Sequence, residues 1–167
     1  MEISTIQPFL QYFSNVRERT LRVVRCVPPD RIDWTYADGK FTIGDLLRHI
    51  AITERFMFAE NVQGHPSRYT SHGREFAETY EQVFLLMDEL HQQSMEIFAH
   101  LTAEDLQRKC PTPGGVPITT WKWLRSMAEH EIHHRGQLYL YLALLNVPTP
   151  ALYGLTSEQV RSNSSST

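Results

Sequence analysis

Residues 119–146 read TTWKWLRSMAEHEIHHRGQLYLYLALLN, with no proline and a single glycine. Apolar side chains recur along this stretch at helical spacing, at Trp123, Met127, Leu138, Tyr141 and Leu145. This period predicts a long amphipathic helix that begins at Thr119 or Thr120 and ends near Asn146. Pro148 and Pro150 stop it, because proline lacks a backbone donor.

Two histidines interrupt the apolar face of this helix. His130 and His134 are four residues apart, so their Cβ atoms lie ~5–6 Å from each other, and one cation can accept a nitrogen from each at ~2.0–2.1 Å. His133 points ~100° away and is a poorer candidate. The spacing alone leaves core and surface histidines open as alternatives. Burial of two imidazoles without a partner is costly, which favours a metal site.

A second helix is expected over residues 42–63. It begins with Thr42-Ile43-Gly44-Asp45, which has the form of a capping box with aspartate in place of glutamate. His49 lies at the edge of its apolar face, and a helix packed beside residues 119–146 would aim this ring at His130 and His134. Three imidazoles with one open position are typical of a catalytic metal site.

Two more helices are expected, from about Thr5 to Cys26 and from about Glu75 to Leu101, with a short helical turn capped by Thr102. Connections occupy residues 28–41, 64–74 and 111–117, and no alternating pattern predicts a strand of useful length. The sequence predicts an all-α four-helix bundle as one domain over residues 1–160. Residues 161–167, mostly serine, are expected to form a disordered tail.

Charge and composition exclude several classes of protein. The net charge is −3, which argues against nucleic-acid binding because that requires clustered positive charge. Arg17, Arg19, Arg22 and Arg25 are interpreted as a solvated helix face. The N-terminus lacks the features of a secretory signal, and no run of ~18 apolar residues predicts a membrane span. A cytoplasmic location without a membrane partner is therefore expected.

Three segments carry a resemblance to a known family. They are residues 44–51, GDLLRHIA; residues 130–137, HEIHHRGQ; and residues 150–156, PALYGLT. In the same order and spacing they resemble the DinB/YfiT-like superfamily, and the third is similar to the tail of its damage-inducible DinB branch. The likeness covers the chain to about residue 160. It implies an up-down-down-up four-helix bundle, often a homodimer, with a divalent metal held by His49, His130 and His134.

The resemblance also implies a metal-dependent enzyme with a small-molecule substrate. Zinc or nickel is the expected metal, iron and copper also suit imidazole ligands, and manganese is a further alternative. The metal would activate a thiol or a water, giving a transferase that uses a low-molecular-weight thiol, or a hydrolase. A non-catalytic metal-binding module of the stress response is the alternative.

Other polar residues near the expected ligands have two interpretations each. Glu54, Glu131 and Gln137 are candidates to orient a ligand or contact substrate, or else have a surface or packing role. Tyr141 is expected mainly to pack in the core. His65 and His72, in the loop after residue 63, either reach over the site or are exposed loop residues.

Overall fold

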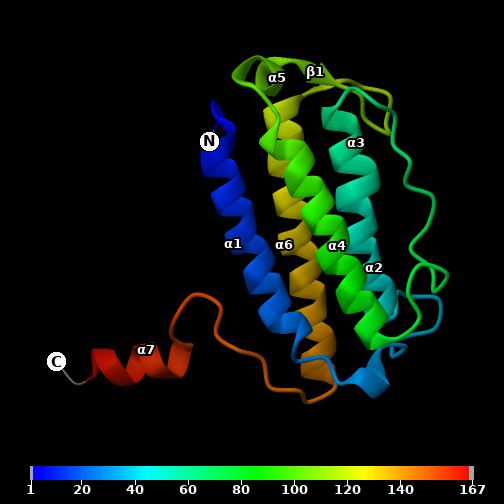
Figure 1. Cartoon of the computed structure of the whole chain (residues 1–167). Helices are drawn as coiled ribbons and strands as arrows, with labels where there is room; N and C mark the ends of the chain where they lie inside the picture. The colour runs from blue at the N-terminus through cyan, green and yellow to red at the C-terminus, as the bar shows by residue number, and fades with distance from the viewer. Residues whose placement is uncertain (1, 166–167) are drawn as a thin grey trace.

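Four long helices lie side by side and form the body of the protein, which a computed structural model describes from residue 2 to residue 165 (Figure 1). They are α1 (Ile6–Val24), a continuous helix made of α2 (Ile43–Thr53), η2 (Glu54–Phe58) and α3 (Ala59–Val62), then α4 (Tyr80–Ala99) and α6 (Thr120–Leu144). The predicted all-α four-helix bundle is confirmed. The largest difference in a boundary is the start of α4, which begins at Tyr80, five residues after the expected Glu75, behind a capping box between Thr79 and Gln82.

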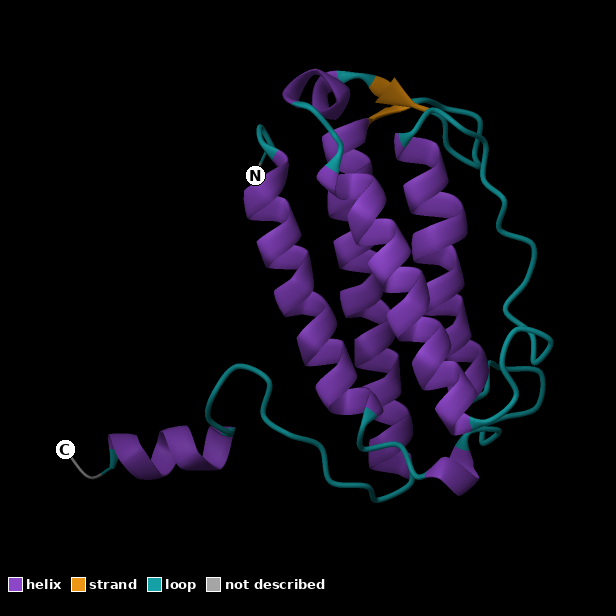
Figure 2. Cartoon of the chain, in the orientation of Figure 1, coloured by secondary structure: helices purple, strands orange, loops and turns teal. Residues whose placement is uncertain are grey.

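The helices run in an up-down-down-up order, as the resemblance implied. In Figure 1, α1 and α6 run in one direction, and both α2–α3 and α4 run in the other. A connection over residues 63–79 therefore crosses the length of the bundle, and Figure 2 shows it as the long loop beside α3. α2 packs against α4 and α6, and α1 packs against the same two helices. The crossing loop thus lies beside the helix that carries His49.

Short elements close the two ends of the bundle. The predicted capping box at α2 is present, with the Asp45 amide donating to Thr42 Oγ1 at 3.0 Å, and η1 (Pro29–Arg31) precedes it. α5 (Ala103–Gln107) begins at the predicted Thr102 cap. Strands β1 (Lys109–Cys110) and β2 (Ile118–Thr119) pair antiparallel around the predicted 111–117 loop. Two residues per strand are too few to produce an alternating pattern.

The core consists of two hydrophobic clusters. One contains Val23, Leu46, Leu47, Ile50, Met87, Leu138 and Leu142, and the other contains Phe9, Phe13, Phe58, Phe98, Leu124 and Met127. On each long helix a buried or half-buried polar residue falls between the two clusters, namely Arg17, Glu54, His91 and Glu131. These four residues are called the polar layer below. The layer divides the hydrophobic interior at the level of the histidines.

Arg17 contradicts the prediction that the arginines of α1 form a solvated face. Its side chain is buried, and Nη2 forms ion pairs with Glu54 and, at 3.0 Å, with Glu131 Oε2. His91 Nδ1 lies 2.9 Å from the second oxygen of Glu54. The prediction was wrong for Arg17 because this residue shares the inward stripe of α1, one turn after Phe13.

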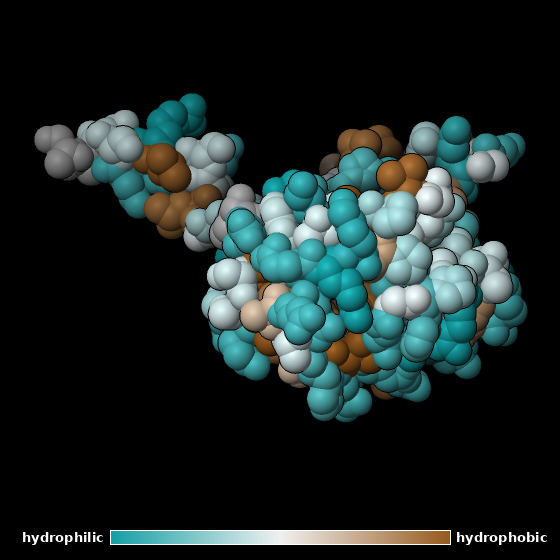
Figure 3. Space-filling view, turned by 90° about the horizontal axis from the view of Figure 1, so that it is seen from above, coloured by the Kyte–Doolittle hydropathy of each residue, from teal (hydrophilic) through white to brown (hydrophobic). Residues whose placement is uncertain are grey.

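The C-terminal segment leaves the bundle and ends in α7 (Ser157–Ser164), which stands apart from the body in Figures 1 and 3. A capping box between Thr156 and Gln159 starts α7 at Ser157, and the disorder expected from residue 161 stays a prediction. Residues 166 and 167 lie outside the described part of the chain. The domain limit at residue 160 stays a prediction.

Among residues 2–165, none of the helices combines the length and apolar character that crossing a membrane requires.

Candidate metal centre

The three predicted histidines meet between α2 and α6. His49 Nε2 lies 3.1 Å from His130 Nε2, which lies 3.0 Å from His134 Nε2. One ligand atom from each ring falls within 4.8 Å of those of the other two. The structure thus brings together rings from two helices, including the residue that sequence spacing alone could not place.

The outer nitrogens of two rings are held by other side chains. His134 Nδ1 lies 2.6 Å from Gln137 Oε1. Since an amide oxygen only accepts, Nδ1 donates the hydrogen and the lone pair of this ring is on Nε2. His49 Nδ1 lies 3.1 Å from the Tyr69 hydroxyl and 3.3 Å from the Thr53 hydroxyl. These contacts turn the Nε2 atoms toward their common point.

The donor set fits a divalent cation. Two nitrogens bound at ~2.0–2.1 Å to a tetrahedral zinc would lie ~3.3 Å apart. The observed separations of 3.0 and 3.1 Å fall a few tenths of an ångström below this value. The third pair, His49 and His134, has ligand nitrogens within 4.8 Å of each other, so a shift of the rings that brings this pair closer would let all three share one ion. Direct imidazole contacts at this spacing otherwise leave two lone pairs facing each other or a single shared proton.

Burial keeps the histidines neutral. It lowers the pKa of His49 to about 4 and that of His130 to about 3, and repulsion from neighbouring imidazoles, His134 first, acts in the same direction. Burial also lowers the pKa of His134, although its hydrogen bond to Gln137 acts in the opposite direction. All three rings are therefore neutral at pH 7, which is the state that binds metal.

The remaining histidines lie outside this group. The ring centroid of His133 is 5.0 Å from that of His134, but its nitrogens do not join the group. His65 is exposed and lies 3.4 Å from Glu60. His72 reaches the site's edge, because its Nδ1 lies 2.7 Å from the Tyr69 hydroxyl that contacts His49. Of the two loop histidines, only His72 thus reaches the site.

The candidate orienting residues divide into two groups. Gln137 contacts a ligand ring directly, as described above. Glu54 and Glu131 instead enter the polar layer, where both pair with Arg17. Burial raises the pKa of Glu131, although the charge of Arg17 opposes this. Tyr141 has the expected packing role: its ring lies 5.6 Å from Trp34, and its hydroxyl donates to the Phe41 carbonyl at 3.0 Å.

Sequence reasoning missed the residues that cover the outer side of His49. Tyr69 belongs to the crossing loop, and the Phe41 ring lies 5.5 Å from the His49 ring and 4.3 Å from the His72 ring. Both are in irregular segments, where no period predicts which side chains point inward. The one available signal was the close spacing of Tyr69 and His72, because His72 was already a candidate to reach over the site.

A sequence model of the DinB superfamily matches residues 12–138. The chain belongs to the DinB superfamily. The match includes His49, His130 and His134. The three-histidine group thus lies within the part of the chain that matches the DinB superfamily.

Individual proteins show the same relationship. YjoA of Bacillus subtilis (strain 168), described as uncharacterized, is 25% identical over 136 residues, covering 80% of this chain and 86% of YjoA. The crystal structure of YjoA aligns with a TM-score of 0.70 over 87% of this chain and 97% of that one. YfiT from Bacillus subtilis, described as a probable metal-dependent hydrolase with an unusual four-helix bundle topology, aligns with a TM-score of 0.70 at 16% identity, over 89% and 91%.

A third structural neighbour is larger. A histidine-to-alanine mutant of the mycothiol-dependent maleylpyruvate isomerase aligns with a TM-score of 0.63 at 11% identity, covering 80% of this chain and 60% of that one. At this level of identity the likeness shows a shared DinB-type fold.

Proposed function

We propose that this DinB protein is an enzyme that depends on a divalent metal bound by His49, His130 and His134. The observation that carries the proposal is the approach of three neutral Nε2 atoms to within 3.0–3.1 Å along the chain His49–His130–His134. A cation bound there lowers the pKa of a water or thiol ligand, so that the nucleophilic anion forms near neutral pH. The protein's part is to hold the three rings and to bind the substrate beside them.

The number of protein donors supports an enzyme over a purely structural metal module. Within residues 2–165 the group contains three histidines and no fourth histidine, cysteine or carboxylate. Structural zinc sites use four protein ligands, whereas catalytic sites use three and leave a position for water or substrate. A stress-response module whose metal only stabilises the bundle would be expected to close that position.

The surroundings of His130 suggest where an apolar part of a substrate binds. The Phe58 ring lies 5.8 Å from the His130 ring and 4.6 Å from the Trp123 ring. Trp123 in turn lines an open groove of about 530 Å³ together with Met57, residues 112–114 and residues 116–118. One aromatic ring thus separates this largely apolar groove from the metal centre. A small molecule with an apolar part fits this arrangement.

Water and a low-molecular-weight thiol are the two candidate nucleophiles. YfiT, described as a probable metal-dependent hydrolase, favours water, and the mycothiol-dependent isomerase favours a thiol. The open position accepts either. We propose transfer of a thiol to an electrophilic substrate as the reaction, with hydrolysis as the alternative.

Metal analysis of the purified protein tests the site. We expect one equivalent of zinc, nickel or another divalent metal in the wild type, and a loss of metal in His130→Ala. His133→Ala is the matched control, because it removes an imidazole from the same helix that lies outside the group. Retention of metal by His130→Ala, or equal loss in both variants, would contradict the proposal.

An activity screen of the metal-loaded protein then distinguishes the nucleophiles. Glutathione, mycothiol and bacillithiol are each combined with electrophiles, and ester and amide substrates are tested without thiol. Turnover that requires a thiol supports S-transfer, and turnover with water alone supports hydrolysis. Lack of turnover in both arms by a protein with full metal content would favour the non-catalytic module.

A further inference from the structure

Two loop side chains, Tyr69 and His72, continue a series of hydrogen bonds outward from His49. The Tyr69 hydroxyl lies 3.1 Å from His49 Nδ1 and 2.7 Å from His72 Nδ1. Both are hydrogen-bonding distances. Tyr69 and His72 come from the crossing loop, whereas His49 comes from α2. The loop therefore contacts a proposed metal ligand through a specific polar group.

Binding of a metal at His49 Nε2 would fix the direction of these hydrogen bonds. With its Nε2 lone pair in use, the His49 ring carries its hydrogen on Nδ1 and donates it to the Tyr69 oxygen. The single hydroxyl hydrogen of Tyr69 is then free to be donated to His72 Nδ1. His72 must in turn be the tautomer with its hydrogen on Nε2.

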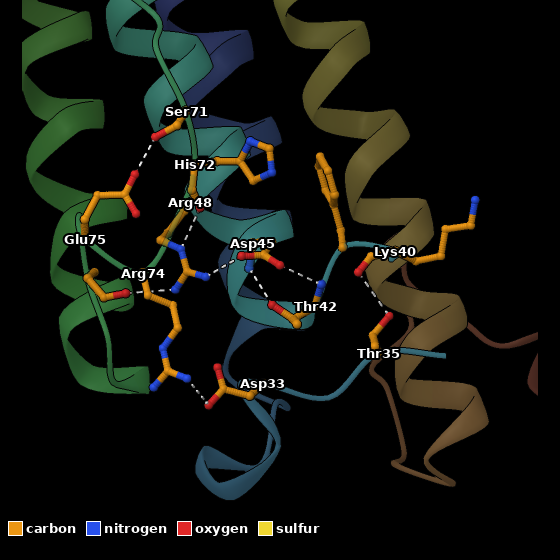
Figure 4. Close-up of polar contacts among 12 residues, drawn as sticks. Asp33, Thr35, Lys40, Thr42, Asp45, Arg48, Ser71, His72, Arg74 and Glu75 are labelled. Atoms are coloured by element: carbon orange, nitrogen blue, oxygen red, sulfur yellow. Dashed lines mark hydrogen bonds and ion pairs between the residues drawn. The ribbon is translucent and has the colours of Figure 1, made fainter. Parts of the chain in front are cut away.

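Arg48, the residue before His49, fastens one end of this loop segment. Its side chain is fully buried, and its Nε and Nη1 donate to the carbonyl oxygens of His72 and Ala77 at 2.8 Å each. Figure 4 shows Arg48 beside the main chain at His72, with Nη2 directed at Asp45 Oδ1 at 2.6 Å. A buried arginine with three satisfied donors holds the loop in one position.

The π-helix η2 fastens the other end. The amide of Arg68 donates to the Phe56 carbonyl at 2.7 Å, and the Ser67 hydroxyl lies 3.4 Å from the same oxygen. Phe56 lies within Glu54–Phe58, where the wider π turn leaves this carbonyl available to the loop. Tyr69 and His72 are thus held between two anchors on the continuous helix that carries His49.

We propose that Tyr69 and His72 are positioning residues of the metal centre, and that they act by fixing the ring orientation and tautomer of His49 through the chain His49 Nδ1, Tyr69 hydroxyl, His72 Nδ1. The inference rests on the proposed metal site. Partners of this kind, which hydrogen-bond the outer nitrogen of a ligand histidine, typically change metal affinity ~10–100-fold when removed. The loop over α2 is accordingly a part of the metal centre.

The test is a Co²⁺ titration of the full-length protein, in competition with a chelating indicator, for the wild type, Tyr69→Phe and Tyr80→Phe. Tyr69→Phe should bind Co²⁺ about 10- to 100-fold more weakly, with a changed visible absorption spectrum of the bound ion. Tyr80→Phe removes a hydroxyl near the Val24 carbonyl, away from the site, and should match the wild type. Thermal unfolding of the metal-free variants checks that each is folded.

A measurement on the wild type alone completes the test. Long-range ¹H–¹⁵N correlation of the zinc-loaded protein should show the hydrogen of His72 on Nε2 and that of His49 on Nδ1. If the wild type does not bind Co²⁺ or Zn²⁺, the proposed function fails. If the wild type binds metal, two results overturn the positioning role while the metal site stands. One is that Tyr69→Phe binds Co²⁺ equally well with the same spectrum, and the other is that His72 carries its hydrogen on Nδ1.

Discussion

His49 Nε2 and His130 Nε2 lie 3.1 Å apart although the two residues are 81 positions apart in the sequence. The distance depends on how α2 packs against α6, so the donor set exists only in the folded bundle. A ligand that binds the folded state but not the unfolded state stabilises the fold by mass action. Metal binding and folding are therefore expected to be linked in this DinB protein.

Metal should raise the thermal stability of the protein. At free Zn²⁺ of one hundred times the dissociation constant, the gain is about 2.7 kcal/mol, or an increase in Tm of about 5–10 °C for a domain of this size. His134→Ala should show no such increase. His100→Ala, which changes an exposed residue after α4, should behave as the wild type in the same thermal scans. An equal increase in His134→Ala would mean that zinc stabilises the protein from another place.

Gln137→Ala should weaken metal binding about tenfold, because the hydrogen bond that holds His134 Nδ1 at 2.6 Å is lost. Gln137→Glu keeps an acceptor at this position and should retain most of the affinity. Gln92→Ala on the exposed side of α4 is the control. Competition with a chelating indicator measures all three, and an unchanged affinity in Gln137→Ala would exclude an orienting role.

Arg17→Met should destabilise the bundle by about 3–5 kcal/mol, because Glu54 and Glu131 would remain buried without their shared cation. Arg25→Met removes an exposed ion pair with Glu18 and should cost less than about 1 kcal/mol. Urea unfolding gives both values. The triple variant Arg17→Met, Glu54→Gln, Glu131→Gln should recover part of the loss, and an equal loss in single and triple variants would show that charge is not the cause.

Glu60 should make stability depend on acid pH. Burial acts to raise its pKa, but hydrogen bonds from Arg55 and Arg68 outweigh this and place it below the ordinary value of 4.5. A carboxyl with a lowered folded pKa stabilises above its unfolded pKa, and this contribution is lost as pH falls through the folded pKa. Glu60→Gln should thus lose about 1–3 kcal/mol at pH 7.

The same comparison at low pH checks the cause of that loss. Below the folded pKa the difference in unfolding free energy between wild type and Glu60→Gln should largely disappear, because both side chains are then neutral. Glu129→Gln, which changes an exposed residue paired with Arg125, should show little difference at either pH. A difference for Glu60→Gln that is constant with pH would point to packing instead of charge.

Homodimer formation stays a prediction that rests on family resemblance. Sedimentation equilibrium should give a species of twice the chain mass of 19.4 kDa. A single species at the chain mass over the accessible concentration range would contradict it.

The sequence predicts much of the fold because the helices have strong local signals. The period of residues 119–146, the Thr42 capping box and the prolines after residues 26 and 146 are each recognisable without tertiary information. The pair His130 and His134 follows from helical spacing alone. His49 does not, because its place in the group depends on the angle at which two helices pack. Its position at the edge of the apolar face made it a candidate, and the family resemblance supported it.

Other features depend on long-range contacts. Tyr69 reaches the site through an irregular loop, and its position is set by Arg48 and by the Phe56 carbonyl. Arg17 was assigned to the surface by its charge, although its place on the apolar stripe of α1 indicated the core. Whether a charged residue at an inward position is buried depends on partners of opposite charge from other helices. The sequence of a single helix does not show those partners.

A π-helix contains one residue more per turn than the α-helix that it interrupts, and in this chain it separates His49 from the buried turn at Val62. One row of buried residues spaced four positions apart runs along this helix, at Ile50, Glu54, Phe58 and Val62. In a regular α-helix each such step drifts by ~40°, and the wider turn takes up part of that drift. A single π turn accommodates one extra residue while the flanking α-helical turns keep their orientation, so deleting one residue between 54 and 58 should convert η2 to regular α-helix with little rotation of the two halves. A homologous chain with a one-residue gap at this place would therefore keep both faces of the helix, but its Phe56 carbonyl would pair within the helix and the crossing loop would lose its anchor at Arg68.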